Sequence, residues 1–514
     1  MRLAELIDGL GLRVRGASGV GGVDAAALRV CDITEDSRTA LPGSLFIARP
    51  GTKSDGRAFI RAAVEAGAEA VLTDSEPDAA ALSANPGVVY LVSANVPETA
   101  AVLAERFYGN PTRRLKLMGV TGTNGKTTIA HAVHQILNAT KRRCGLIGTV
   151  MIDDGREVAD AVMTTPPACE LSGTFAHMLE AGCVAAAMEV SSHSLDQHRT
   201  TALDYDVAVF TNLTGDHLDY HGTMDRYAGA KATLFRILRD DAAAVVNADD
   251  PWHARMVRDC KARVLRCSLD AATGADCRVE AQAPTFNGTL AAFIGPWGRI
   301  EATIAMVGRH NLMNCLQAIA AAIAMGVATD ELSRAAPLLA APPGRLERVT
   351  VPGLEHRFAV FVDYAHTDDA LANVLRAARP LVSAGSSLRV VFGCGGDRDR
   401  TKRPRMARVC CELADHVFVT SDNPRTEQPA AIIDDILEGV PDAARARVAI
   451  DADRRAAIHH AVASCRAGDV LVIAGKGHET YQLLPDGKGG IRRTDFDDRV
   501  VARAAMAGSV PQHA

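Results

Sequence analysis

The chain has 514 residues, so about three domains are expected if each has the usual size of roughly 150 residues. Hydrophobic residues make up 48% of it and charged residues 23%, a composition that is typical of folded proteins and excludes extensive disorder. The 56 Lys and Arg against 61 Asp and Glu give a formal net charge of −5, which excludes attachment to nucleic acid through overall positive charge.

The first segment, residues 1–96, is predicted to be a small mixed α/β domain. Its start, Met1–Asp8, contains no apolar core, so no signal peptide is expected. Its end is predicted near Asn95–Pro97, immediately before a helical stretch, Glu98–Phe107.

The middle segment, residues 97–342, alternates apolar runs with amphipathic stretches, which indicates a parallel sheet. The predicted strands are Leu115–Val120, Val184–Val190, Val207–Phe210 and Ala242–Val246, and the predicted helix is Thr127–Leu137. The apolar run Ala318–Ala328 is far shorter than the roughly 20 residues of a membrane-spanning helix, so no span is expected. The segment ends at Ala341–Gly344, where two prolines and a glycine are expected to interrupt helix on both sides.

The last segment, residues 343–514, repeats this alternation. Its predicted strands are Phe358–Val362, Leu388–Phe392, Val417–Thr420, Val448–Ile450 and Val470–Ile473, and Ala370–Ala378 is a predicted helix. The expected fold is therefore α/β in three domains: a mixed N-terminal domain, a central parallel-sheet domain and a C-terminal Rossmann-like domain. The twelve cysteines include no CxxC pair, which indicates scattered thiols in a cytoplasmic protein.

A glycine-rich turn, Thr121–Thr128, joins the first predicted strand of the middle segment to its helix. Strand, glycine turn, Lys-Thr and helix are the parts of a phosphate-binding loop for ATP or GTP, although Val120 stands where the usual pattern has its first glycine. Backbone N–H groups would hold phosphate oxygens, Lys126 would reach the β- and γ-phosphates, and the Thr127 hydroxyl would bind Mg²⁺. The predicted nucleotide-binding residues here are Gly122, Thr123, Asn124, Gly125, Lys126, Thr127 and Thr128.

Two polar loops follow two further strands of this segment. Glu189–Arg199 comes directly after one strand, and Thr211–His221 comes after the next. Because ligands of open α/β sheets bind outside the carboxyl ends of the strands, both loops are candidates for a site. The carboxylate of Glu189 is suited to hold Mg²⁺ opposite Thr127.

Together, these stretches resemble the Mur ligases, ATP-dependent amide-forming enzymes of peptidoglycan precursor synthesis. The resemblance is carried by GTNGKTT at Gly122–Thr128, EVSSH at Glu189–His193 and TNLTGDHLDYHG at Thr211–Gly222. The missing first glycine is typical of that family. Asp36–Arg38, Pro42–Phe46 and Asp55-Gly56 extend the resemblance to the family's uridine-nucleotide domain.

The resemblance implies a binding site for a UDP-sugar linked to a muramoyl peptide. The residues carried over by motif position are Ser37, Thr52, Lys53 and Ser54 for the nucleotide sugar, and Thr164, Thr165, Ser191, Gln197 and Arg199 for the muramoyl dipeptide.

Lys231 stands where the family has a carbamylated lysine. An ammonium group would repel Mg²⁺, whereas a carbamate formed with CO₂ inverts the charge and supplies oxygen ligands. The implied metal ligands are Thr127, Glu189, His217 and Lys231, and the implied catalytic residues are Lys126, Lys231 and His217.

For the last part of the ATP site, the resemblance implies Asn311 and Asn314 on the nucleotide, Arg345 on phosphate, and Asp363 on ribose or metal. One residue departs from the family pattern: Asp368 replaces the usual proline after Ala-His-Thr, which is expected to loosen the loop after His366.

The tetrapeptide Asp422–Arg425 (DNPR) resembles the signature of family members that add meso-diaminopimelate instead of L-lysine. Diaminopimelate carries a second carboxylate and ammonium at its far end, and Arg425 is suited to bind that carboxylate with two hydrogen bonds. L-Lysine would leave the arginine unpaired, which disfavours it. The residues expected around diaminopimelate are Arg398, Asp422, Asn423, Pro424, Arg425, Gly475 and Glu479.

The resemblance thus predicts a monomeric ligase with three small-molecule substrates: a UDP-muramoyl dipeptide, meso-diaminopimelate and ATP. It is expected to act through an acyl phosphate, with Mg²⁺ and a CO₂-derived carbamate, and without nucleic acid. Two alternatives remain open at this point. One is another amide ligase of the superfamily, such as a folylpolyglutamate synthetase, and the other is a P-loop regulatory or motor ATPase.

Overall fold

A computed structural model describes residues 1–16, 27–51, 55–285, 288–354 and 356–508. The predicted substrate residues Thr52, Lys53 and Ser54 lie outside the described residues. The chain divides into two compact units. Unit 1 comprises Met1–Ser268, Thr273–Asp276 and Gln317–Ala328, and unit 2 comprises Leu269–Ala272, Cys277–Leu316 and Thr329–Ala514. The three-domain boundaries after residues 96 and 342 stay a prediction.

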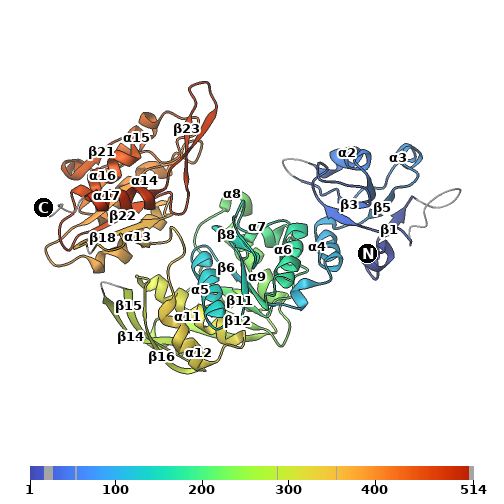
Figure 1. Cartoon of the computed structure of the whole chain (residues 1–514), viewed down its shortest axis with the longest axis horizontal. Helices are drawn as coiled ribbons and strands as arrows, with labels where there is room; N and C mark the ends of the chain where they lie inside the picture. Colours follow the sequence, from blue (N-terminus) through green and yellow to red (C-terminus); the bar gives the residue numbers. More distant parts are fainter. Residues whose placement is uncertain (17–26, 52–54, 286–287, 355, 509–514) are drawn as a thin grey trace. The chain divides into compact units, whose positions relative to one another are not determined.

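Unit 1 begins with a five-stranded sheet in the order β1-β5-β4-β3-β2 (Figure 1). Its strands are β1 (Arg13–Arg15), β2 (Asp32–Thr34), β3 (Ser44–Ile47), β4 (Ala68–Thr73) and β5 (Val89–Val92), with helices α1 (Leu3–Ile7), η1 (Gly56–Phe59), α2 (Ile60–Glu65), α3 (Ala79–Ala84) and α4 (Val96–Phe107). All pairs are parallel except β1 with β5. Because successive strand residues point to opposite faces, Leu45 and Phe46 enter two separate hydrophobic cores.

The central sheet of unit 1 has β6 in its interior, in the order β13-β12-β11-β6-β10-β7-β8-β9. Its strands are β6 (Lys116–Thr121), β7 (Cys144–Ile147), β8 (Met151–Asp153), β9 (Val158–Asp160), β10 (Ala185–Glu189), β11 (Val207–Phe210), β12 (Ala243–Asn247) and β13 (Arg263–Ser268). Its helices are η2 (Pro111–Arg113), α5 (Lys126–Ala139), α6 (Ala168–Glu180), α7 (Ser192–Asp196), α8 (Leu218–His221), α9 (Met224–Arg236) and α10 (His253–Met256). Val120 of β6 pairs with Glu189 of β10, and Thr121 pairs with Phe210 of β11. This register places the loops that follow these three strands side by side.

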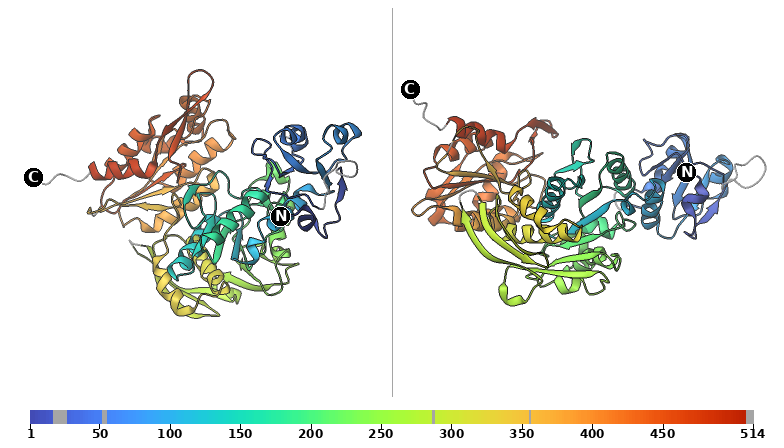
Figure 2. Two further views of the ribbon diagram at one scale, coloured as in Figure 1. Left: turned by 45° about the vertical axis from the view of Figure 1, so that its right-hand side comes forward. Right: turned by 60° about the horizontal axis from the view of Figure 1, so that its bottom comes forward.

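Unit 2 contains three antiparallel strands, β14 (Cys277–Thr285), β15 (Gly288–Gly295) and β16 (Gly298–Ile304), which are the long yellow-green strands of Figure 2. It also contains α12 (Thr329–Ala335) and η4 (Ala336–Leu338), while η3 (Ala271–Thr273) and α11 (Arg309–Ala324) contribute residues to both units.

The second sheet of unit 2 has the order β17-β18-β22-β19-β20-β21 and is parallel except for β17. Its strands are β17 (Glu347–Val349), β18 (Ala359–Asp363), β19 (Leu388–Phe392), β20 (His416–Val419), β21 (Val448–Ile450) and β22 (Val470–Ala474), and a hairpin follows, β23 (Tyr481–Pro485) with β24 (Ile491–Asp495). Its helices are α13 (Asp368–Ala378), η5 (Arg379–Leu381), α14 (Lys402–Leu413), α15 (Pro429–Leu437), η6 (Asp442–Arg447), α16 (Arg454–Ala463) and α17 (Asp498–Gly508). Residues of α13, α14 and α15 share one hydrophobic core and those of α16 and α17 another, so helices cover both faces of this sheet.

The predicted strands of the middle and last segments are confirmed, most within one residue at each end. The central sheet is parallel from β13 to β7, as expected, and β8 and β9 extend it as antiparallel strands. Two expectations are wrong. Ala341–Gly344 is followed not by a helix but by β17, which pairs with β18. Asp368 does not loosen its loop: it is the first residue of α13, which Thr367 caps by accepting from the Ala370 N–H.

No helix in the described ranges is both long and apolar enough to cross a membrane. None of the twelve cysteines, all of which the structure describes, forms a disulfide, and nine of them are buried, in agreement with the prediction of scattered thiols.

Candidate active site

The phosphate loop lies between β6 and α5, as the sequence predicts. Gly122 has φ +149°, and a Cβ there would lie 1.8 Å from Thr211 Oγ1, so only glycine fits. The loop is held by Asn212, whose backbone oxygen accepts from the Thr123 N–H at 2.9 Å and whose Oδ1 accepts from the Asn124 N–H at 3.0 Å. Thr211 and Asn212 were not among the predicted site residues, although their position directly after the strand β11 could have indicated them.

Two lysines converge on the backbone of this loop. Lys126 Nζ donates to the carbonyl oxygens of Gly122 at 3.0 Å and Thr123 at 2.8 Å. Lys231 Nζ, from α9, donates to the same Gly122 oxygen at 2.8 Å and lies 4.6 Å from the centre of the Tyr227 ring. Burial, together with the charge of Lys126, lowers the pKa of Lys231 well below its usual value. A buried amine with a lowered pKa therefore lies beside the phosphate loop.

The proposed metal ligands Thr127 and Glu189 are in direct contact. Thr127 Oγ1 donates to Glu189 Oε2 at 3.1 Å, and Glu189 is fully buried with Oε1 accepting from the Thr149 N–H at 2.7 Å. Hydroxyl and carboxylate oxygens are ligands that Mg²⁺ prefers. The ring of His217 lies 4.8 Å from that of His193. Within the part of the chain that the structure describes, no three His, Cys, Asp or Glu side chains are grouped to hold a metal.

Three residues predicted for the muramoyl dipeptide connect to Glu189. Thr164 Oγ1 lies 3.0 Å from Thr149 Oγ1, which itself donates to Glu189 Oε2 at 3.1 Å. Thr165 Oγ1 donates to the Glu189 carbonyl at 2.9 Å and accepts from the Ser191 N–H at 3.1 Å. The structure thus brings Thr164, Thr165 and Ser191 together beside the phosphate loop.

The remaining predicted substrate residues of this unit, Gln197 and Arg199, form a second group. Arg199 donates through Nη2 to Gln197 Oε1 at 2.7 Å and through Nη1 to the Thr165 carbonyl at 2.8 Å. Arg49 joins them from the first sheet, with Nη2 donating to the Gln197 carbonyl at 2.8 Å. Ser37 is half-buried in the turn after β2.

In unit 2, Asp363 ends β18 and organises two loops. Its carboxylate accepts from the N–H groups of Leu346 at 2.6 Å and Ala365 at 2.8 Å, and burial raises its pKa. The Arg345 guanidinium lies over the Tyr364 ring, 4.9 Å from its centre. On α11, Asn314 Nδ2 donates to Asn311 Oδ1 at 3.1 Å, and both side chains are buried.

The Asp422–Arg425 loop follows β20 and is held by β23. Gln482 Nε2 donates to the Asp422 carbonyl at 2.6 Å, and the Arg425 N–H donates to the Leu483 carbonyl at 3.0 Å. Gly475, directly after β22, has φ +120°, and a Cβ there would lie 2.4 Å from Asp422 Oδ2, so this approach requires glycine. The predicted residues of this loop therefore meet at the carboxyl ends of β20 and β22.

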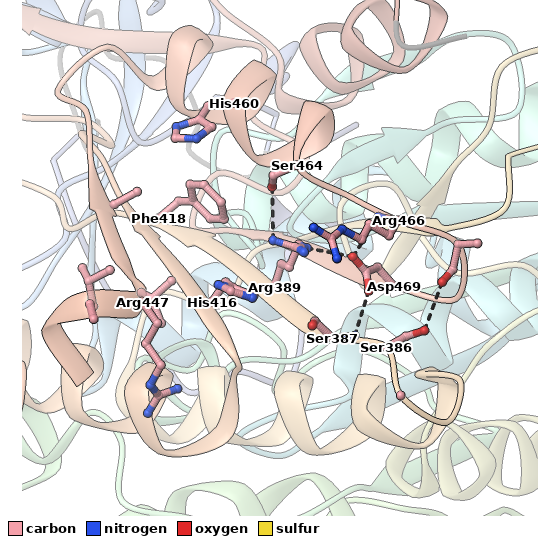
Figure 3. Close-up of a pocket in the computed structure, with 16 residues that line it drawn as sticks. Ser386, Ser387, Arg389, His416, Phe418, Arg447, His460, Ser464, Arg466 and Asp469 are labelled. Atoms are coloured by element: carbon pink, nitrogen blue, oxygen red, sulfur yellow. Dashed lines mark hydrogen bonds and ion pairs between the residues drawn. The ribbon is translucent and has the colours of Figure 1, made fainter. Parts of the chain in front are cut away.

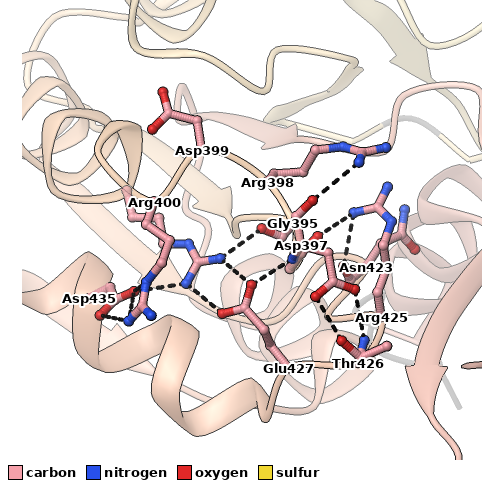
Figure 4. A network of polar contacts seen from close by, with 12 residues as sticks. Gly395, Asp397, Arg398, Asp399, Arg400, Asn423, Arg425, Thr426, Glu427 and Asp435 are labelled. Carbon is pink, nitrogen blue, oxygen red and sulfur yellow. Dashed lines mark hydrogen bonds and ion pairs between the residues drawn. The ribbon is translucent and has the colours of Figure 1, made fainter. Parts of the chain in front are cut away.

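Arg425 and Arg398 lie on two neighbouring loops (Figure 4), which the buried Arg403 connects through Glu427. Arg403 is fully buried and pairs with Glu427 at 2.7 Å, and Glu427 accepts from the Asp397 N–H at 2.6 Å. Arg425 Nη1 donates to the Gly396 carbonyl at 2.8 Å, whereas Arg398 is exposed and donates only to the Asp397 carbonyl among the described residues. Sequence reasoning missed Arg403.

Glu479 is already engaged by protein groups. Its Oε2 accepts from Asn423 Nδ2 at 2.8 Å and from Lys476 Nζ at 2.9 Å. Lys476 is fully buried, and its Nζ also donates to Asn423 Oδ1 at 3.1 Å. Lys476 was not predicted as a site residue from the sequence.

A cavity of about 630 Å³ lies elsewhere in unit 2, at the amino ends of β19 to β22 (Figure 3). Arg389 donates there to Asp469 at 3.0 Å and to Ser464 at 3.2 Å, and Arg447 donates to the backbone carbonyls of Cys411 and Ala414. Two of its three arginines are thus satisfied within the protein, and no predicted site residue lines it.

The strand, glycine turn and helix around Lys126 and Thr127, within a parallel sheet, define an α/β P-loop protein. Three stretches match family descriptions: "Mur ligase family, catalytic domain" at residues 30–108, "Mur ligase middle domain" at 120–322, and "Mur ligase, glutamate ligase domain" at 344–477. The chain belongs to the Mur ligase family, a family of ATP-dependent ligases.

Its relatives include the UDP-N-acetylmuramoyl-L-alanyl-D-glutamate–2,6-diaminopimelate ligase of Synechococcus elongatus, 45% identical over 94% of this chain and 95% of that protein. A solved structure of a ligase with the same name is 31% identical, covers 99% of both chains and has a TM-score of 0.70. The folylpolyglutamate synthase of Mycobacterium tuberculosis is 21% identical over 72% of this chain and 91% of its own, with a TM-score of 0.58, a likeness of fold alone.

Proposed function

We propose that this protein joins meso-diaminopimelate to UDP-N-acetylmuramoyl-L-Ala-D-Glu and converts ATP to ADP and phosphate. The observation that carries the proposal is the Asp422–Arg425 loop at the carboxyl end of β20, where Asn423 donates to Glu479 and Arg425 donates to the Gly396 carbonyl. The relatives with the same reaction in their names, at 40–45% identity, support it.

The chemistry needs little covalent participation by the protein. A carboxylate is a poor electrophile, so its oxygen first attacks the γ-phosphorus of ATP, which forms an acyl phosphate and releases ADP. The amine of diaminopimelate then attacks the acyl carbon and expels phosphate, losing a proton. Lys126 and the backbone N–H groups at the start of α5 hold and neutralise the phosphates, because the N–H groups of Thr123 and Asn124 are engaged by Asn212. Catalysis is therefore mainly positioning and charge neutralisation.

The oxygen donors of Thr127 and Glu189 fit Mg²⁺, which supplies charge neutralisation to the phosphates when bound. His217 and Lys231 complete the proposed ligand set. Carbamylation suits Lys231, because its buried amine reacts with CO₂ in the neutral form and the resulting carbamate is anionic. His217 and this carbamate are the candidates for receiving the proton of the attacking amine.

The proposed substrate contacts follow the two units. In unit 1, Ser37 holds the nucleotide sugar, and Thr164, Thr165, Ser191, Gln197 and Arg199 hold the dipeptide. In unit 2, Asn311, Asn314, Arg345 and Asp363 serve ATP, and Arg398, Asp422, Asn423, Pro424, Arg425, Gly475 and Glu479 serve diaminopimelate. We further propose that the protein is a monomer and acts in the cytoplasm, where free thiols persist.

Phosphate release with ATP and UDP-N-acetylmuramoyl-L-Ala-D-Glu tests the proposal, with meso-diaminopimelate, L-lysine or no amino acid added. Release that depends on diaminopimelate supports it. Release that depends on L-lysine would instead indicate an L-lysine ligase, and release without any amino acid would indicate a regulatory ATPase. A separate reaction with ATP, folate and glutamate tests for a folylpolyglutamate synthetase, which would release phosphate there.

A further inference from the structure

Arg49 and Glu35 form a charged cluster with Arg199 that the sequence motifs do not explain. Arg49 Nη1 lies 3.7 Å from Glu35 Oε2, which is within ion-pair range but too long for a hydrogen bond. Its Nη2 donates to the Gln197 carbonyl, while the side-chain oxygen of Gln197 accepts from Arg199. Gln197 thus joins both guanidinium groups.

The cluster has an excess of positive charge. It contains two guanidinium groups and one carboxylate, which leaves a net charge of +1 when Glu35 is ionised. The nearness of the two cations and the burial of Arg199 both lower the pKa of Arg199. An additional anion is therefore needed to balance the group.

One polar atom in the cluster also lacks a partner. Glu35 Oε1 is buried and makes no hydrogen bond to any described residue, and burial raises the pKa of this carboxyl. A buried oxygen without a donor is unfavourable. This oxygen needs a donor, which an anion does not supply, so it is the excess positive charge of the two guanidinium groups that points to an anionic ligand.

The cluster lies at the end of a series of contacts that leads away from the phosphate loop through the residues proposed to bind the dipeptide. Thr165 contacts Glu189, Arg199 contacts Thr165, and Arg49 is separated from Arg199 by Gln197. A carboxylate that reaches Arg49 is therefore displaced along this row from the one that is phosphorylated. The glutamate of the proposed substrate has two carboxylates, and only one of them forms the new amide bond.

We infer that Arg49 is a further substrate-binding residue, which together with Arg199 holds the carboxylate of the terminal glutamate that does not react. Glu35 is a positioning residue that keeps the Arg49 guanidinium directed toward Gln197. This inference rests on the proposed function, because it names a group of that substrate.

Titration calorimetry without ATP tests it with three ligands: UDP-N-acetylmuramoyl-L-Ala-D-Glu, the same molecule with the non-reacting carboxylate converted to an amide, and UDP-N-acetylglucosamine, which has no carboxylate. For Arg49→Met we expect the Kd of the first ligand to rise at least tenfold and the Kd values of the other two ligands to change less than twofold. Glu35→Gln should weaken the first ligand about threefold.

Arg61 and Glu65 provide matched controls, since they form an exposed ion pair at 2.7 Å in the same part of unit 1. Arg61→Met and Glu65→Gln should leave all three Kd values unchanged. If Arg49→Met does not fold, Arg49→Lys replaces it, because a lysine keeps the positive charge but loses one donor group. This variant should raise the Kd of the first ligand alone and leave the Tm unchanged.

Equal weakening of all three ligands, or a lower Tm with unchanged Kd, would show that Arg49 only joins the two loops and would overturn the inference. Unchanged binding of the first ligand would do the same. Failure of the proposed function has a different signature: either the wild-type protein does not bind the dipeptide nucleotide, or it binds it and releases phosphate with L-lysine instead of meso-diaminopimelate.

Discussion

The ammonium group of Lys476 lies 2.9 Å from Oε2 of Glu479, and the lysine side chain is completely buried. Asn423 bonds to both groups, so three residues of two loops form one closed set of polar contacts. The carboxylate proposed to receive the far ammonium of diaminopimelate is therefore held in place before that substrate arrives. Preorganisation of this kind reduces the free energy lost on ordering the site when the ligand binds.

Lys476→Met should disrupt this set. It leaves the carboxylate of Glu479 without its charged partner, and breaking a buried ion pair costs about 3–5 kcal/mol of stability. We expect a lower Tm and at least a tenfold higher KM for diaminopimelate, with the KM for ATP within twofold of wild type. Lys488→Met, on the exposed tip between β23 and β24, is the control and should change none of these values.

Arg425→Ala should abolish most incorporation of diaminopimelate and leave nucleotide binding intact. Loss of a charge-paired carboxylate contact costs about 2–5 kcal/mol, which corresponds to a fall in kcat/KM of roughly 30- to 4,000-fold. Arg425→Lys should recover little, because a lysine cannot form two parallel hydrogen bonds. Steady-state kinetics with an unchanged KM for diaminopimelate in the alanine variant would contradict the assignment.

Lys231→Ala should be nearly inactive, because the proposed carbamate ligand is lost. Short carboxylates such as acetate should recover part of the activity, since they can occupy the space that the lysine leaves and supply oxygen atoms. The measurement is phosphate release with and without added carboxylate, with Lys488→Ala as the control. Full activity of the variant without any addition would refute the role of Lys231.

Gly122→Ala should inactivate the phosphate loop. The new Cβ would collide with Thr211 Oγ1 at 1.8 Å, and the backbone at φ +149° disfavours any side chain. We expect loss of ATP binding by calorimetry and loss of turnover. Gly87→Ala is the control, because its Cβ meets no atom within 4 Å. Normal ATP affinity in Gly122→Ala would show that this backbone does not hold the phosphates.

Glu105 should make stability depend on pH. Its carboxyl accepts hydrogen bonds from Thr112 at 2.8 Å and Ser172 at 3.0 Å, and burial raises its pKa above 4.5. The folded protein therefore retains this proton at pH values where the unfolded chain has lost it. The stability from this group is present below pH 4.5 and is lost as pH rises through the folded-state pKa.

Urea titrations between pH 4 and pH 8 measure the free energy of unfolding of Glu105→Gln and of wild type. Differences of about 0.5 kcal/mol in this free energy can be resolved. Wild type should lose stability relative to the variant as pH rises. The exposed Glu65→Gln serves as the control. A difference that stays constant across the range would exclude a raised pKa at Glu105.

The local parts of this protein could be predicted from the order of its residues. The strand, turn and helix at Gly122–Thr128, and the polar loop after Glu189, depend on neighbouring residues whose backbone preferences and hydrogen bonds are short in range. For the same reason most strand limits were predicted within one residue, and the Asp422–Arg425 loop was correctly placed after a strand.

The distant residues that complete these parts become visible only in the folded chain. Asn212 supports the phosphate loop from the loop after β11, Lys476 meets Asn423 across two loops, and Arg49 reaches Gln197 from the loop after β3. The antiparallel strands β14 to β16 were likewise not predicted, because strand pairing depends on partners far along the chain. Such contacts form only when burial brings separate segments together, and no local pattern encodes their distances.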